Sequence, residues 1–381
     1  MKMQDPQMHD HKRTKARNVI MIAIFIMLTA TAWFLWIPLK NVVNTENTEK
    51  RELSSMPSVT ETGIRAFPSL FEDWVNDHIP FRNQMISLRG AVEYGIFHSS
   101  TNSSVIPGKS DWLFNNMDGA MDAYLGTDTL TQEQLRQIAE NLITVRDEAA
   151  AQGAEFVLYI APDKDRVYSR YMPGSCGEPS DTYAVSQIVS YLRENTDIRV
   201  VYPLEELQNA SQELEDQGIT TYMKGDTHWN KLGAYIGARP LMAELGVSMP
   251  SWDSSRVSIT TEGNASCDLA DMMGIRNLYP VTPLYSVEQK DRNPSEVDEY
   301  DIQTAYRFHA TGADPRKIYL YEDSFGYFLD DVIRYEFDRS VMTFGDNKPS
   351  AVMPEEKPDI FVYETVTRLA VSRLSDLSQL Y

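Results

Sequence analysis

The stretch YLYEDSFG at residues 319–326 joins a short apolar segment to an Asp-Ser pair and to the start of a predicted helix. A serine placed between a strand and a helix lies on a sharp turn, so its hydroxyl can project above the sheet. The free N–H groups at the start of the helix can stabilise negative charge that develops there. Ser324 is therefore a candidate nucleophile. The alternative is that Asp323 or Ser324 serves only as a helix N-cap.

Short apolar strands and helices alternate along the chain on both sides of this stretch. Strands are predicted at 155–160, 198–204, 317–321, 340–344 and 359–363, and helices at 131–151, 182–194, 231–245, from about 325, and at 367–380. Such alternation predicts an α/β fold with a parallel sheet covered by helices on both faces. In such sheets the active site lies beyond the carboxyl ends of the strands.

The remaining segments carry weaker patterns. Helical spacing with aromatic residues is visible over 64–98 and is broken at Pro80. The segment SSVIPGKSDWLF at 103–114 predicts a turn at Pro107-Gly108 between two short strands. Residues 246–316 are rich in Pro, Ser and Asp without clear periodicity, and they are expected to form an irregular insertion.

A second segment with chemical potential is KGDTHWN at 224–230, directly before the helix predicted at 231–245. Serine is a poor nucleophile unless a base takes its proton, and a histidine does this best when a carboxylate holds its other ring nitrogen. Asp226 and His228 are two residues apart, so both side chains can point the same way in an extended loop. The alternatives are a surface aspartate with a capping or core histidine, or a metal site. The other histidines show no matching spacing, so neither a metal nor a cofactor is expected.

The distribution of charge excludes one class of partner. The chain of 381 residues has 35 Lys/Arg and 55 Asp/Glu, a net charge of −20. Residues 1–40 carry about +4, which leaves about −24 for residues 41–381. A body this acidic repels nucleic acid, whose phosphates need basic partners. An anionic polymer would also need a local basic groove.

Residues 19–39, VIMIAIFIMLTATAWFLWIPL, contain no charged residue and are long enough to span a bilayer as a helix. Basic residues stand before this segment and acidic ones after it, which favours a cytoplasmic N-terminus. The expected order is a basic cytoplasmic segment at 1–18, a transmembrane signal-anchor helix at 19–39, a linker at 40–56 and an extracytoplasmic domain at 57–381. The alternative is a cleaved signal peptide with a cleavage site near Ala30-Thr31-Ala32. Either reading places the body outside the cytoplasm.

The two cysteines, Cys176 and Cys267, are too few for a disulfide scaffold, and no CxxC spacing is present. A single disulfide is possible in an exported domain, because that environment is oxidising. Two unpaired thiols are the other possibility.

Taken together, these segments resemble the SGNH-like domain of the alginate O-acetyltransferase family (the AlgX and AlgJ type) and the related DHHW proteins. In that family a D-x-H-W motif comes first and a D/T-S-F/Y serine motif follows, a circularly permuted order relative to other SGNH hydrolases. This chain has DTHW at 226–229 and DSF at 323–325. Further similarity lies in RELSSMP at 51–57, DHIPFR at 77–82, GKSDWLF at 108–114, APDKDRVY at 161–168 and DLADMMG at 268–274.

The resemblance implies a three-layer α/β/α, flavodoxin-like domain in which Ser324 is the nucleophile, His228 the general base and Asp226 the residue that orients the histidine. The oxyanion blocks of SGNH hydrolases have no clear equivalents here. The backbone N–H groups of Ser324 and Gly326 are candidates by position, and Tyr363 is a weaker one. Trp229 is a candidate wall of a sugar site or a core residue. Thr367 stands where relatives often have an acidic residue next to the following arginine.

Three functions follow as hypotheses. The first is an O-acetyltransferase that passes an acetyl group through a serine acyl-enzyme to hydroxyls of an exported polysaccharide or cell-wall glycan. For this function, the resemblance implies a multi-pass membrane acyltransferase as the acetyl donor. The second is a carbohydrate acetyl esterase with the same triad and water as the acceptor. The third is a non-catalytic glycan-binding or assembly protein, for which the serine and histidine would lie far apart.

Overall fold

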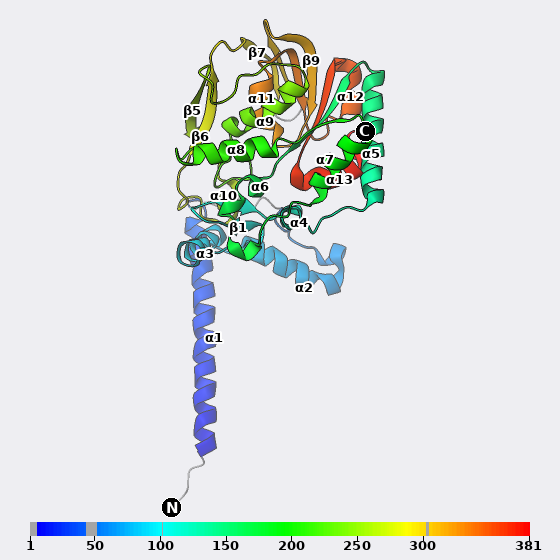
Figure 1. Ribbon diagram of the computed structural model, residues 1–381. Coiled ribbons are helices and arrows are strands. Elements are labelled where there is room, and N and C mark those ends of the chain that lie inside the picture. The colour runs from blue at the N-terminus through cyan, green and yellow to red at the C-terminus, as the bar shows by residue number, and fades with distance from the viewer. Residues whose placement is uncertain (1–5, 43–51, 101, 302–304) are drawn as a thin grey trace, which may run out of the picture. The chain divides into compact units, whose positions relative to one another are not determined.

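The computed structural model describes residues 6–42, 52–100, 102–301 and 305–381, without the side chains of residues 6–16, 28–29 and 32–33 (Figure 1). Residues 43–51 of the predicted linker lie outside the described residues. The chain divides into two compact units, which are residues 1–97 with 271–275 and residues 98–270 with 276–381.

The first unit contains three helices, α1 (Pro6–Leu39), α2 (Val59–His78) and α3 (Arg82–Phe97). The break predicted at Pro80 is confirmed, because α2 ends before this residue and α3 begins after it. Aromatic rings of α2 stack one turn apart, with centroids 5.0–5.7 Å from one another. The stacked rings are Phe67, Phe71, Trp74 and His78.

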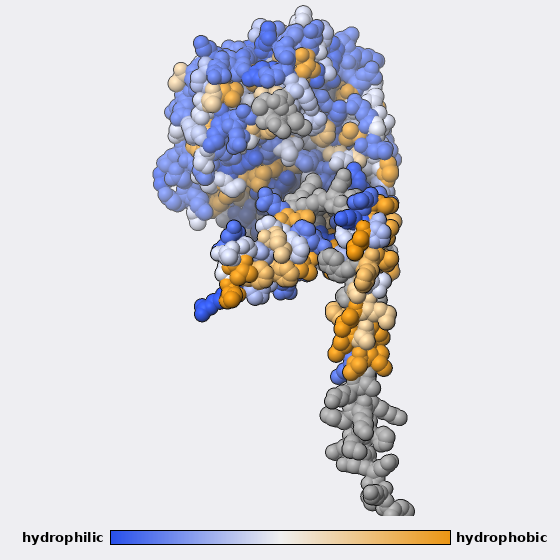
Figure 2. Space-filling model, turned by 180° about the vertical axis from the view of Figure 1, so that it is seen from behind, coloured by the Kyte–Doolittle hydropathy of each residue, from blue (hydrophilic) through white to orange (hydrophobic). Residues whose placement is uncertain are grey.

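Helix α1 includes residues 19–39, the predicted transmembrane segment. The side chains of residues 19–27 are all apolar, and the large ones among them are 49–67% exposed. Figure 2 shows this apolar surface along the helix. Among the residues that are described, no helix is both long enough and apolar enough to cross a membrane.

The second unit is built on a seven-stranded mixed sheet. Its spatial order is β4 (Arg199–Val201), β3 (Glu155–Ala161), β11 (Ile360–Val366), β9 (Asp314–Tyr321), β10 (Phe337–Thr343), β8 (Ala305–Ala310) and β7 (Ser295–Asp301). The strands from β4 to β10 are parallel, as predicted. β8 and β7 are antiparallel, so the prediction of a wholly parallel sheet is wrong at this edge.

Helices cover both faces of the sheet, which confirms the three-layer architecture (Figure 1). One face packs against α5 (Gln132–Ala151), α7 (Ala184–Asn195) and α13 (Thr367–Ser375), and the other against α8 (Leu204–Glu215), α9 (Lys231–Glu244) and α11 (Gly326–Ile333). The remaining helices are α4 (Ala120–Leu125), α6 (Lys164–Val167), α10 (Asp268–Met272) and α12 (Pro349–Glu356). Strand β3 shows how both faces of the sheet are buried. Phe156, Leu158 and Ile160 belong to the core on one face, while Val157 and Tyr159 belong to the core on the other. Successive side chains of a strand point to opposite faces, so a strand buried on both sides is apolar throughout.

Local signals place the ends of individual elements. At the start of α5, the side chain of Thr131 accepts a hydrogen bond from the backbone N–H of Gln134, and the Gln134 side chain accepts one in return. This capping box satisfies donors that the first helical turn leaves unpaired, and it confirms the predicted helix start. The predicted turn near Gly108 is also confirmed, between β1 (Val105–Pro107) and β2 (Leu113–Asn115). A Cβ at Gly108 would lie 2.6 Å from the Phe114 ring and from the Tyr171 carbonyl oxygen.

The prediction that residues 246–316 are irregular is wrong. β5 (Val257–Asn264) and β6 (Pro283–Gln289) pair as an antiparallel ribbon, and β7 and β8 extend the main sheet. β5 and β6 form a two-stranded ribbon, β7 is the edge strand, and β8 lies next to it. Strands in such places carry charged residues and lack a continuous apolar run. β7, with the sequence SEVDEYD, is an example.

Cys176 and Cys267 are not joined by a disulfide. Burial raises the pKa of the Cys176 thiol, against a smaller opposing effect of Ser175. A raised pKa keeps the thiol protonated and therefore weakly nucleophilic.

Candidate active site

Ser324 lies in the turn between the carboxyl end of β9 and the start of α11. The Asp323 side chain holds this turn with both oxygens: Oδ1 accepts from the backbone N–H of Phe325 at 2.9 Å, and Oδ2 from that of Val366 at 2.8 Å. The second bond ties the turn to the end of the neighbouring strand β11. Ser324 makes no capping hydrogen bond to α11 and is exposed, so its hydroxyl is available for chemistry.

The D-x-H segment forms a tight loop before α9. Tyr222 and Trp229 pair across it as an antiparallel bridge, which brings the residues between them into a compact turn. Trp229 is fully buried, and its indole N–H donates to the carbonyl of Phe325 at 2.9 Å. This bond joins the histidine loop to the serine turn. Of the two readings of Trp229, the structure therefore favours the core residue. The ring of His228 lies 5.0 Å from that of Phe325.

The side chains of Asp226, His228 and Ser324 form a continuous hydrogen-bonded chain. His228 Nε2 lies 2.8 Å from Ser324 Oγ, and His228 Nδ1 lies 2.7 Å from Asp226 Oδ1. A carboxylate accepts only, so Nδ1 carries the proton and Nε2 is left to accept from the serine hydroxyl. Burial alone would raise the pKa of Asp226, but hydrogen bonding and attraction from His228 outweigh it and lower that pKa. Asp226 is thus held as the anion that a histidine base requires.

The predicted oxyanion-binding groups differ in whether another group already uses them. The N–H of Gly326 donates to the carbonyl of Asp323 at 3.1 Å, so the turn itself uses it. Tyr363 is buried in the core on the α5 side of the sheet, where its hydroxyl accepts from Gln379 at 2.6 Å. Among the described residues, none accepts a hydrogen bond from the backbone N–H of Ser324. That group remains the best placed of the predicted donors.

Lys164 is a buried lysine that supports the loop carrying Asp226 and His228, a role that the sequence did not predict. The Lys164 ammonium donates to the carbonyl oxygens of Met223 at 3.1 Å, of Lys224 at 3.2 Å, and of Asp226. These three acceptors use the three N–H donors of the ammonium. Lys164 therefore holds together the backbone segment that presents Asp226 and His228.

The neighbours of Lys164 favour the charged form of this buried amine. Burial lowers the pKa of Lys164 to about 7, and the nearby carboxylates of Asp226 and Asp268 partly oppose this shift. The ammonium also lies 5.7 Å from the ring centroid of Trp112 and 5.5 Å from that of Phe114. Both rings belong to the GKSDWLF segment, whose similarity to the family thus has a structural basis. In the sequence, Lys164 is part of the APDKDRVY segment at 161–168, which follows the strand predicted at 155–160.

Three buried carboxyl groups lie beneath the serine turn. Glu322 directly follows β9, Glu364 lies in the adjacent strand β11, Asp330 belongs to α11, and each is at most 5% exposed. Burial, followed by the charges of Asp330 and Glu364, raises the pKa of Glu322 well above its ordinary value, and a hydrogen bond with Asp330 adds to this shift. Glu322 therefore keeps its proton. A Cβ at Gly326 would lie 2.2 Å from the Glu322 carboxyl, so only glycine fits at this position.

Glu322→Gln is expected to stabilise the protein at pH 8 relative to wild type by at least about 1 kcal/mol, and to change stability little at pH 4. The pKa of Glu322 is raised on folding, so its contribution is fully present below its unfolded pKa and is lost as pH rises through the folded value. Glutamine mimics the protonated acid at every pH. Urea unfolding at both pH values measures the difference, with the exposed Glu213→Gln as control. A pH-independent effect would contradict the prediction.

An ion pair closes the site on the β3 side. Arg368, on α13, pairs with Asp163 and donates its backbone N–H to the same carboxylate at 2.8 Å. Its guanidinium lies 5.4 Å from the ring centroid of Phe325, next to the nucleophile. Thr367, the departure from the family pattern, is buried and donates to the carbonyl of Ala161 at 3.1 Å. A small pocket, of about 210 Å³ when its opening to solvent is included, is lined by Asn115, Ala120, Asp163, Lys164, Asp165 and Thr227.

Asp226, His228 and Asp268 each offer one ligand atom, and these atoms lie within 4.8 Å of one another. The same atoms have other roles, because His228 Nδ1 binds Asp226, and Asp268 accepts from the backbone N–H and hydroxyl of Thr227. The arrangement serves the hydrogen-bonded chain, and the expectation of no metal stays a prediction.

The site thus consists of a serine, a histidine and an aspartate at the carboxyl edge of a parallel β-region, in a three-layer α/β/α domain. This combination defines an SGNH-like protein. Residues 105–310 match the family described as the SGNH hydrolase-like domain of the acetyltransferase AlgX. The match covers more than half of the chain, and the protein therefore belongs to this family.

Similar curated proteins have names that agree with this family. The chain is 26% identical over 213 residues to the probable alginate O-acetylase AlgJ of Pseudomonas putida, covering 54% of this chain and 50% of the relative. It is 24% identical over 280 residues to the protein of the same name from Pseudomonas syringae pv. tomato, covering 72% and 63%. The chain thus spans about half to two thirds of the length of these relatives.

Two solved structures share the fold. A DHHW family protein from Eubacterium siraeum aligns with a TM-score of 0.52 at 13% identity, over 73% of this chain and 99% of that one. Bacillus cereus PatB1 with a sulfonyl adduct aligns with a TM-score of 0.50 at 14% identity, over 71% and 97%. At such low identity the similarity establishes the architecture alone.

Proposed function

We propose that the protein is a serine-dependent O-acetyltransferase that modifies hydroxyls of an exported polysaccharide or cell-wall glycan. The hydrogen-bonded chain from Asp226 through His228 to Ser324 carries the proposal. Membership of the AlgX family and similarity to probable alginate O-acetylases support the acetyl group and the glycan acceptor. The permuted motif order, inferred from the resemblance, stays a prediction.

In the first half-reaction, Ser324 Oγ attacks the acetyl carbonyl of the donor while His228 Nε2 takes the hydroxyl proton. The tetrahedral oxyanion forms beside the Ser324 backbone N–H. It collapses as the bond to the leaving group breaks, and His228 returns the proton to that group. Asp226 stabilises the transient imidazolium through Nδ1. An acetyl ester on Ser324 remains.

In the second half-reaction, a glycan hydroxyl attacks the acetyl ester and gives its proton to His228 Nε2. Collapse of the second oxyanion releases the acetylated glycan, and the proton passes to Ser324 Oγ. The serine is thereby regenerated and no cofactor is consumed. Attack by water would make the protein an esterase with the same residues, so the choice between the two depends on how the acceptor is positioned and how water is excluded.

The third hypothesis, a glycan-binding protein without catalysis, has a specific observation against it. It expected Ser324 and His228 to lie far apart, whereas Nε2 and Oγ are 2.8 Å from one another. An assembly role gives no physical reason for a buried aspartate, an oriented imidazole and an exposed hydroxyl in one line.

The test uses the full-length chain, purified in mild detergent and mixed with a chromogenic acetyl ester. We expect release of the chromophore and a mass increase of one acetyl group that maps to Ser324. Added glycan oligosaccharides are expected to take the acetyl group in preference to water, which mass spectrometry of the glycan measures. Acetate as the sole product with every glycan would favour the esterase, and an unmodified Ser324 in folded protein would refute the acyl-enzyme.

We also propose that residues 19–39 anchor the protein in the cytoplasmic membrane, with the catalytic unit outside and a multi-pass membrane acyltransferase as the donor. The absence of charge in this segment and the basic residues before it support the location. The donor is an expectation from the resemblance. Protease digestion of intact spheroplasts checks the location, and protection of the catalytic unit would refute it.

A further inference from the structure

Helix α3 carries an exposed apolar face. Four of its residues follow one another at spacings of three or four, so they lie within about 80° of one another around the helix. They are Met85, Leu88, Val92 and Ile96, and their exposed fractions are 63%, 65%, 42% and 67%. We call these four residues the α3 apolar face.

The opposite side of α3 packs on the protein. A Cβ at Gly90 would lie 2.2 Å from the carbonyl oxygen of Met273 and 2.9 Å from Ile275, so the two backbones approach closely here. Gly90 is buried, and it lies roughly 160° around the helix from the centre of the α3 apolar face. Residues 271–275 belong to the same unit as α3. The α3 apolar face therefore points away from the contact that holds the helix in this unit.

Helix α2 adds aromatic side chains to the same unit. Its stacked rings are those of Phe67, Phe71, Trp74 and His78, which follow one side of the helix. Leu70 and Phe71 are 39% and 36% exposed. Figure 2 shows apolar residues on both α1 and α2. Aromatic side chains that combine an apolar ring with a polar group, such as Trp74, favour the boundary between a bilayer and water.

The proposed membrane anchor ends next to these two helices. The ring of Trp36, in the last turn of α1, lies edge-on to the ring of Phe81, with 5.4 Å between the centroids. Phe81 lies in the turn between α2 and α3. Figure 1 shows α2 running crosswise to α1. A helix that is crosswise to a membrane-spanning helix lies along the surface of the bilayer.

The charges of α2 and α3 do not favour binding to anionic headgroups. The two helices contain three arginines and five acidic residues. Electrostatic attraction to a membrane requires an excess of Lys and Arg. Contact of these helices with a membrane would therefore depend on their apolar side chains, and salt would weaken it little.

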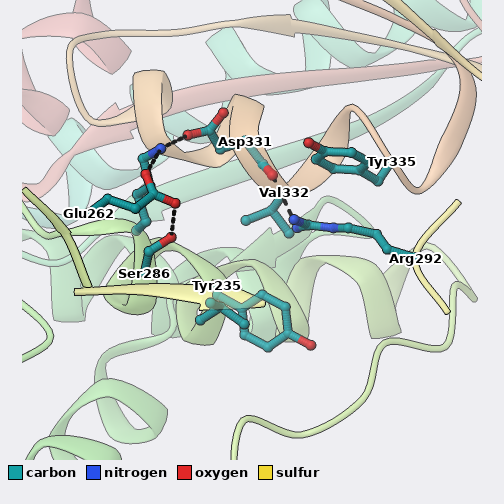
Figure 3. Close-up of a pocket in the computed structure, with 9 residues that line it drawn as sticks. Tyr235, Glu262, Ser286, Arg292, Asp331, Val332 and Tyr335 are labelled. Atoms are coloured by element: carbon teal, nitrogen blue, oxygen red, sulfur yellow. Dashed lines mark hydrogen bonds and ion pairs between the residues drawn. The ribbon is translucent and has the colours of Figure 1, made fainter. Parts of the chain in front are cut away.

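A polar pocket of the second unit has the opposite character, because its charges are already paired with one another. It lies between α9, α11 and the β5–β6 ribbon, where Lys231 is 2.7 Å from Glu262 and 2.9 Å from Asp331 (Figure 3). Ser286 donates to Glu262 at 2.8 Å. A ligand would have to displace these bonds, whereas a partner of the α3 apolar face displaces only water.

We propose that the α3 apolar face and the aromatic side of α2 lie in the headgroup region of the outer leaflet of the membrane that holds α1. Amphipathic helices bury an apolar face about 5–10 Å into this region. Lipid is the occupant that the position favours, because the bilayer surface adjoins the end of α1 whether or not another protein is bound. The inference rests on the anchor in the proposed function and adds a second, interfacial contact to it.

The test places a nitroxide label on the full-length chain in vesicles of phosphatidylethanolamine and phosphatidylglycerol. Cys176 and Cys267 are replaced by serine, and Leu88→Cys carries the label. Molecular oxygen concentrates in the bilayer and a nickel chelate stays in water, so the ratio of their collision rates with the label reports lipid contact. We expect this ratio to be at least about fivefold higher at position 88 than at the control position.

Ser87→Cys is the matched control, because Ser87 is exposed and adjoins Leu88 but lies about 100° away around the helix. Val92→Glu combined with Ile96→Glu is expected to lower the ratio at position 88 to that of the control. Two carboxylates withdraw the helix from the bilayer, while α1 still holds the chain. The ratio at position 88 in the unsubstituted helix should persist in about 1 M salt, because screening weakens only charge attraction.

A label at position 88 that meets the nickel chelate as often as the control does would overturn the inference. A label shielded from both reagents, or broadened by the label of a second copy, would also overturn it, because such signals mean a protein partner. Thermal unfolding establishes that each variant is folded, and Val92→Cys replaces Leu88→Cys if that variant unfolds.

Flotation of the chain with the vesicles tests the anchor by itself. A chain that does not float refutes the anchor and this inference together. A chain that floats with a water-exposed position 88 refutes only the interfacial contact. Acetylation of Ser324 is measured independently of both, so failure of this inference leaves the proposed chemistry intact.

Discussion

Ser324→Ala is expected to lower the rate of acetyl transfer by at least about 10⁴-fold, because a methyl group cannot attack the donor carbonyl. The acetyl group at position 324 should disappear completely from the intact mass. Binding of the glycan should change little, since the hydroxyl contributes to the reaction and not to the binding of the acceptor. Release of a chromophore from an acetyl ester, followed with and without glycan, measures the loss.

Ser258→Ala, at an exposed position on β5, is the matched control for removal of a hydroxyl and should keep wild-type activity. A Ser324→Ala protein that retains a tenth of the wild-type rate would mean that another group carries the acetyl. The neighbouring groups of the site would then need to be searched for that nucleophile. Unchanged unfolding temperature in both variants ensures that the comparison concerns chemistry.

Lys164→Met is expected to lower kcat by about 100-fold or more, although the side chain touches neither substrate nor the reacting atoms. Methionine fills similar space but leaves the carbonyls of Met223, Lys224 and Asp226 without their donors. Each unsatisfied buried group costs on the order of 1–3 kcal/mol, so the loop is expected to rearrange to reach water or other donors. Displacement of His228 by about 1 Å is enough for such a loss.

A positioning role differs from a purely structural one in its kinetic signature. We expect kcat to fall while KM for a small acetyl ester stays close to wild type, because the binding surface is unchanged. Lys224→Met is the matched control. Lys224 also lies over the Trp112 ring, at 5.7 Å, but donates to a surface loop at Ser110. Equal losses in both variants, or a Lys164→Met enzyme with wild-type kcat, would refute the special role of Lys164.

The periodicity of the chain was sufficient to predict the centre of the fold. Buried parallel strands such as β3 are apolar, in this strand from Phe156 to Ala161, and the helices between the strands carry local start signals such as Thr131 with Gln134. The antiparallel edge could not be predicted in the same way. β7 and β8 contain alternating or charged residues. The place of β8 depends on pairing with β10, and that of β7 on pairing with β8, which no local pattern records.

The sequence by itself determined the alternating strands and helices, the positions of Asp226, His228 and Ser324, and the family to which these segments point. It did so because the chemistry depends on residue types within short motifs. The tertiary structure alone decided what surrounds them, namely the Lys164 ammonium at the histidine loop and the protonated Glu322 beneath the serine turn. Lys164 lies 59 residues before Met223 in the sequence, and Glu322 meets Glu364 only across adjacent strands. The charge states of both groups follow from burial and from neighbours that exist only once the chain has folded.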